Sequence, residues 1–141
     1  FDCDDPRFLK PKCMKDEIQS WFREKNMDEP LTPGDLARTI YRSLAESTAK
    51  ACMQLEEITG RTYETVNIFG GGCQNSLLNK MIAEQTGKKV LAGPVEATAI
   101  GNLAAQLIRD GKCRNLTEAR NIIRNSEQIK IYEGRKQNVQ I

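Results

Sequence analysis

The sequence has no histidine in its 141 residues. Histidine is the side chain that most often acts as a general base near neutral pH, and it is also the commonest zinc ligand. Its absence removes both roles from this chain. Any chemistry here would depend on carboxylates, on backbone groups or on residues supplied from elsewhere.

Long hydrophobic runs and an excess of one charge are missing as well. The apolar runs extend over only a few residues, whereas a helix that crosses a bilayer needs ~20. The 21 basic residues are interspersed with 19 acidic ones, and the few aromatic residues, 6% of the chain, do not alternate with the basic ones. The composition therefore predicts a soluble globular protein that neither crosses a membrane nor binds nucleic acid.

The cysteines form no metal or redox motif. There are five of them, widely separated and without a CxxC pair, which indicates a reducing, cytoplasmic setting. The chain begins with Phe1 and not with methionine, and no signal peptide follows it. We therefore expect it to be part of a longer protein.

Two helices are predicted in the first part of the chain. Residues 1–31 contain three prolines and read as an arm with one short amphipathic helix over 15–25. A long helix then begins after Thr32, whose hydroxyl suits an N-cap, with Pro33 in the first turn, and it ends at Gly60. Its apolar residues recur every three or four positions, which predicts one buried face; they are Leu36, Ile40, Leu44, Ala51, Leu55 and Ile58.

The middle of the chain predicts an α/β fold. An apolar strand over 66–69, a helix over 77–86 and a second strand over 88–92 form a βαβ unit, in which the two strands are parallel. A third helix is expected over 97–108 and a fourth after a cap at Thr117. Ile129 and Ile131 then alternate with polar residues like a short strand, and residues 134–141 are a polar tail.

Three glycines, Gly70, Gly71 and Gly72, separate the first strand of this unit from its helix. Residues without a Cβ let a ligand approach the backbone, and the N–H groups at a helix start attract a phosphate. The alternative is that the glycines only permit a tight turn. Neither a Walker motif nor G-x-G-x-x-G is present, so the pattern alone leaves both interpretations open.

Polar residues after the glycines are further candidates. Asn75 and Asn79 lie four apart on one helix face, where an amide can both donate to and accept from adenine. Asn75 suits an N-cap equally well, whereas Asn79 is expected to face solvent. We predict that Cys73 is inert and that Glu96 only complements the dipole of the third helix.

Two segments resemble a known family. Residues 68–79, IFGGGCQNSLLN, and residues 92–102, AGPVEATAIGN, are similar to the C-terminal domain of the FGGY carbohydrate kinases. Residues 4–9, DDPRFL, and the helix start at 32–34 extend the resemblance over nearly the whole chain. DDPRFL and residues 93–97, GPVEA, narrow it to one branch of the family.

The resemblance implies an actin-like, ribonuclease-H-like ATPase fold of two domains, with ATP and a sugar between them. Residues 32–133 would be the later part of the nucleotide-side domain. Gly70, Gly71 and Gly72 would lie against the α-phosphate and ribose of ATP or ADP, and Asn75 would face the adenine. Mg²⁺ would bridge the phosphates.

The family's catalytic Asp base, its sugar-binding residues and its metal ligands are expected upstream, in the missing N-terminal part. No catalytic or metal-binding residue is therefore assigned in this chain, and the chain alone is expected to be inactive. Two alternatives stay open. One is another sugar kinase of the family, xylulokinase-like or fuculokinase-like; the other is a non-catalytic interaction domain that docks a partner through the small residues at 97–105.

Overall fold

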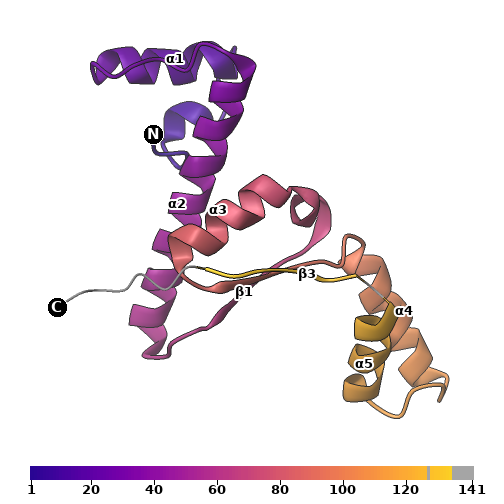
Figure 1. Cartoon of the computed structure of the whole chain (residues 1–141). Helices are drawn as coiled ribbons and strands as arrows, with labels where there is room; N and C mark the ends of the chain where they lie inside the picture. The colour runs from indigo at the N-terminus through magenta and orange to yellow at the C-terminus, as the bar shows by residue number, and fades with distance from the viewer. Residues whose placement is uncertain (127, 135–141) are drawn as a thin grey trace. The chain divides into compact units, whose positions relative to one another are not determined.

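The structure is a computed structural model that describes residues 1–126 and 128–134. It divides into two compact units, an N-terminal unit of Phe1–Thr62 and a C-terminal unit that begins at Tyr63. Figure 1 shows their helices and strands along the chain. No helix in the described ranges combines the length and the hydropathy needed to span a bilayer.

The N-terminal unit contains a short 3-10 helix, η1 (Pro6–Phe8), and two α-helices, α1 (Met14–Glu24) and α2 (Pro33–Thr59). The predicted helix over 15–25 is thus confirmed as α1. Large apolar side chains from all three helices form one cluster; its buried members are Phe8, Ile18 and Phe22, and Phe1, Trp21, Leu36 and Ile40 pack against them.

Both ends of α2 follow local sequence signals. The Thr32 hydroxyl accepts the Asp35 backbone N–H at 3.1 Å, and the Asp35 carboxylate accepts the Thr32 N–H at 3.2 Å, which completes a capping box. Gly60 ends the helix in the left-handed conformation, with φ of 63°. The predicted start and end of this helix are confirmed.

The predicted buried face of α2 is only partly confirmed. Leu36 and Ile40, near the start of the helix, pack against the apolar cluster. Leu44, Ala51 and Leu55 are exposed, and Ile58 is 83% exposed. The prediction was wrong for these four residues because periodicity places them on one side of the helix without saying how far the packing partners extend.

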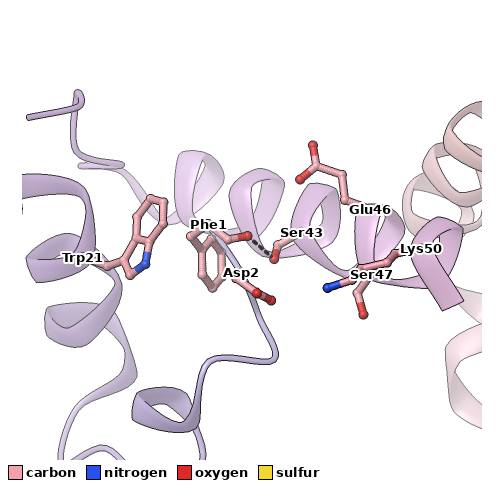
Figure 2. A pocket seen from close by; sticks show the side chains of 7 residues that line it. All are labelled: Phe1, Asp2, Trp21, Ser43, Glu46, Ser47 and Lys50. Carbon is pink, nitrogen blue, oxygen red and sulfur yellow. Dashed lines mark hydrogen bonds between the residues drawn. The ribbon is translucent and has the colours of Figure 1, made fainter. Parts of the chain in front are cut away.

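Hydrogen bonds tie the segment before α1 to both α-helices of the N-terminal unit. The Arg7 guanidinium contacts Glu17 at 2.7 Å and both carboxylate oxygens of Glu24 at 2.8 Å, so that η1 is held to α1. The Ser43 hydroxyl on α2 donates to the Phe1 carbonyl at 2.6 Å and accepts the Cys3 N–H at 2.9 Å. Figure 2 shows the Phe1–Ser43 bond beside a pocket of about 340 Å³.

The C-terminal unit is built on a three-stranded sheet in the order β1 (Thr65–Ile68), β2 (Lys89–Ala92) and β3 (Lys130–Tyr132). β1 and β2 are parallel, with Ile68 opposite Ala92, and β3 is antiparallel to β2. Helix α3 (Ser76–Thr86) connects the parallel strands and packs on β2. The predicted βαβ unit, and with it the α/β fold class, is confirmed.

A helical hairpin lies between β2 and β3 in the chain. It comprises α4 (Ala97–Arg109) and α5 (Leu116–Ser126), which pack through a core of buried Ala104, Cys113 and Ala119. The predicted cap at Thr117 is wrong, since the Glu118 N–H donates to the Asn115 side chain at 3.0 Å. The predicted tail at 134–141 lies outside the described residues except for Gly134.

Candidate nucleotide-binding site

The two motif segments meet at one edge of the sheet. β1 leads into the three glycines and β2 leads into Gly93 and Pro94, and both strands end at the same edge because they are parallel. Two hydrogen bonds join the loops: Gly93 N–H donates to the Ile68 carbonyl at 2.9 Å, and Gly70 N–H donates to the Pro94 carbonyl at 3.3 Å. This is the edge at which open α/β sheets bind ligands.

The glycines form a 3-10 helix, η2 (Gly70–Gln74), instead of an open turn. Gly70 has φ of 72°, a conformation that favours glycine. The N–H of Gly71 precedes the first i→i+3 bond of η2 and so has no intrahelical partner. Gly71 is exposed, and a Cβ built on it would meet no atom within 4 Å. A ligand can therefore approach Gly71 without displacing other residues.

Asn75 forms the N-cap of α3. Its side-chain oxygen Oδ1 accepts the Leu78 N–H at 3.1 Å, so the capping interpretation of this residue is confirmed. The residue is half-buried, and within the described residues no hydrogen bond to its Nδ2 is found. The amide N–H₂ is therefore available to a ligand while the oxygen caps the helix.

The prediction that Asn79 faces solvent is wrong. Asn79 is 0% exposed, and its Nδ2 donates to the Cys73 carbonyl at 2.8 Å. Asn75 lies before the helix, as its N-cap with an extended backbone, and only Asn79 lies within α3. The contact of Asn79 with η2 is one that the spacing of the two residues does not specify.

Cys73 and Glu96 have no evident chemical role here. Cys73 is 5% exposed, so its thiol is closed to solvent. Glu96 is exposed and precedes α4, and its side chain makes no capping bond. Neither residue combines access with a neighbouring base, as a nucleophile would require.

A pocket of about 360 Å³ lies beside η2, and sequence reasoning did not predict all of its lining. Gln74 and Gly93 line it together with Gln128 and Lys130. Lys130 lines the pocket because β3 pairs with β2, which places Lys130 opposite Ala92. The alternation of Ile129 and Ile131 was the available signal, since it places Lys130 on the opposite face from the isoleucines.

Candidate metal ligands are few in the described part of the chain. One group of three such side chains is found there, Asp2, Cys3 and Asp4, and it belongs to the N-terminal unit. Exposed acidic groups of this kind are common without a metal. Around η2, the described residues include no such group, and η2 presents an exposed glycine backbone.

Comparison with known proteins identifies the family. The model of the C-terminal domain of the FGGY family of carbohydrate kinases matches residues 1–109. The chain belongs to this FGGY family. Its matched residues include η2, the start of α3, and the loop after β2.

Relatives of this FGGY chain include three rhamnulokinases. That of Halalkalibacterium halodurans is 45% identical over 131 residues, which cover 93% of this chain and 28% of the relative. That of Bacillus subtilis is 44% identical over 91% of this chain and 26% of its own length, and that of Klebsiella pneumoniae (strain 342) is 37% identical over 93% and 27%. The chain therefore spans about a quarter of the length of these FGGY kinases.

Proposed function

We propose that this chain is the adenosine-binding portion of a rhamnulokinase. The full-length protein would transfer the γ-phosphoryl group of ATP to the 1-hydroxyl group of L-rhamnulose, giving L-rhamnulose 1-phosphate and ADP. The observation that carries the proposal is the open, glycine-lined backbone of η2 at the carboxyl ends of two parallel strands, in a chain of the FGGY family.

In this proposal each residue of the site has a separate role. Gly70 shapes the turn, because its N–H is already bonded to the Pro94 carbonyl. Gly71 and Gly72 are exposed and would lie against the α-phosphate and ribose, with the Gly71 N–H as a donor. Asn75 would donate its Nδ2 hydrogens to the adenine while its oxygen caps α3.

ATP supplies the phosphoryl group, and this chain binds and orients the nucleotide. The catalytic base, the sugar site and the Mg²⁺ ligands would be provided by the preceding part of the protein. Phosphoryl transfer depends on positioning and on stabilisation of charge by groups on both sides of the nucleotide. We therefore expect the chain by itself to bind ATP or ADP weakly and to phosphorylate no sugar.

The test uses the complete reading frame that contains this segment. The purified protein should bind ADP in calorimetry and phosphorylate L-rhamnulose in preference to other ketoses. Absence of adenine-nucleotide binding would refute the kinase proposal, as would an upstream sequence without a glycine-rich hairpin and an Asp base. Preference for another ketose would support the kinase proposal but assign a different sugar substrate.

A matched pair of glycine variants tests the site itself. A methyl group added at Gly71 or at Gly101 would have no atom within 4 Å, and neither glycine has positive φ. Gly71→Ala should weaken ADP binding because the methyl group occupies the ligand's approach, whereas Gly101→Ala on α4 should not. Equal ADP affinity in both variants would show that Gly71 is not part of the nucleotide-binding site.

The competing interaction-domain hypothesis needs a test at surface positions of α4. Ala104 is unsuitable because it is buried in the core between α4 and α5, so Ala104→Glu would disrupt the hairpin whether or not a partner docks. Ala99 and Ala105 are exposed on α4 and are the appropriate positions. Loss of association with unchanged ADP binding in Ala105→Glu would favour an interaction role.

A further inference from the structure

Asn79 is a polar side chain in the interior of the C-terminal unit. It is 0% exposed, as is Val90 of β2. The amide makes one hydrogen bond, from Nδ2 to the Cys73 carbonyl at 2.8 Å, and this bond is itself buried. It links the second turn of α3 back to the end of η2.

This bond fixes one end of the glycine segment. The Asn75 N–H donates to the Gly72 carbonyl at 3.1 Å, and Asn79 holds the next carbonyl, that of Cys73. At the other end, Gly70 is bonded to Pro94. Because each peptide unit is planar, two consecutive fixed carbonyls also fix the orientation of the peptide planes that follow Gly72 and Cys73.

The other half of the amide has no partner. Asn79 Oδ1 is buried and has no hydrogen bond within the described residues. An unpaired buried acceptor is destabilising, and an apolar side chain of similar volume would remove it, but the Cys73 carbonyl would then lose its buried donor. The donor of Asn79 is therefore the feature that a leucine would not supply.

We propose that Asn79 is a positioning residue for the nucleotide site. From inside the protein, its amide holds η2 in the orientation that leaves the Gly71 N–H and the glycine surface open to the ligand. Asn79 itself does not contact the nucleotide. This inference rests on the proposed function for the role of η2, and on the structure for the bond.

The experiment compares the complete protein with its Asn79→Leu variant, which keeps the volume and removes the donor. We expect ADP binding to weaken on the order of ten- to a hundredfold, because a displaced binding group loses its alignment with the ligand. Without nucleotide, amide hydrogen exchange in residues 70–75 should become faster by a larger factor than exchange in β1 and β2, while the KM for the sugar changes little. Lys80→Leu, at an exposed neighbouring position on α3, is the matched control and should change none of these.

The outcomes separate this inference from the proposed function. If the wild-type protein binds ADP and Asn79→Leu binds it equally well, Asn79 does not position the site. If the wild-type protein binds no adenine nucleotide, the proposed function fails, and unchanged exchange in residues 70–75 would then refute the anchoring role independently. If Asn79→Leu does not fold, Asn79→Ser tests the same bond, since its hydroxyl lies one bond nearer the backbone and does not reach the Cys73 carbonyl.

Discussion

The two units of this chain are stabilised by different kinds of residue. The N-terminal unit depends on large side chains, with Phe8, Ile18 and Phe22 buried together and the Phe1 and Phe8 rings 5.0 Å apart. The C-terminal unit buries Ile82 and Val90 together with the small residues Ala83 and Ala92, and its loops contain glycines with positive φ. The first unit should therefore be sensitive to shortened side chains, and the loops of the second should be sensitive to added ones.

The largest effect is expected from shortening a side chain in the N-terminal cluster. Ile18 is 1% exposed, and Ile18→Ala should destabilise this unit by about 3 kcal/mol through lost burial and the cavity left behind. Trp21 is the single tryptophan of the chain and packs against this cluster, so its fluorescence during urea unfolding reports on the unit. Leu9→Ala, at an exposed position, is the control and should have almost no effect.

A smaller effect is expected from adding one methyl group to the C-terminal unit. Gly93 has φ of 125°, and a Cβ there would lie 3.3 Å from the Gln128 carbonyl oxygen. Gly93→Ala should cost about 2 kcal/mol of backbone strain, measured by hydrogen exchange of the β1 and β2 amides. Gly71→Ala should leave the same exchange unchanged, since its Cβ position is open. Similar losses in both variants would contradict the argument from geometry.

Loss of a helix cap should have an intermediate to small effect within the N-terminal unit. Thr32→Ala removes the hydroxyl that accepts the Asp35 N–H, and it should lower the free energy of unfolding by about 1 kcal/mol. Thr48→Ala in the middle of α2 is the matched comparison. Because the Thr48 hydroxyl only bonds back to the Leu44 carbonyl, its removal should be neutral or slightly stabilising.

The smallest effect concerns the ion pairs of Arg7. Its hydrogen bonds, followed by that of Ser20, lower the pKa of Glu24 from 4.5 to about 2. The unfolded chain therefore binds more protons than the folded one between these values, and the contribution of Glu24 to stability, present above pH 4.5, is lost as pH falls to about 2. Since Glu24 is exposed to solvent and Arg7 is only half-buried, the loss is modest. Glu24→Gln should show a shallower decrease of stability over this range in acid unfolding; an identical decrease would exclude the ion pair as its source.

The parts of the fold that the sequence predicted correctly are those specified by neighbouring residues. Thr32, Pro33 and Asp35 lie within one turn of each other, so the start of α2 needs no information from the rest of the chain. The parallel pairing of β1 and β2 follows similarly from one short βαβ segment. Local chemistry and a handedness rule were sufficient in both cases.

The errors arose where distant segments decide between local alternatives. Asn115 and Thr117 both suit an N-cap, and α5 starts after Asn115, which places the buried Ala119 in the core shared with α4. Asn79 is buried and bonded to the end of η2, and no pattern within α3 predicts this contact. The position of Lys130 beside the site depends on the pairing of β3 across a helical hairpin.

The paired hydrogen bonds between the two loops make them one thermodynamic unit. Because Gly93 bonds to Ile68 and Gly70 bonds to Pro94, a displacement of either loop strains both bonds. Energetic effects of substitutions in the two loops should therefore not add, and a double-mutant cycle between Gly70→Ala and Gly93→Ala should give a coupling energy of about 1 kcal/mol. The glycine motif and the Gly-Pro-Val-Glu-Ala motif, 23 positions apart from Gly70 to Gly93, should thus respond to substitution as a single element.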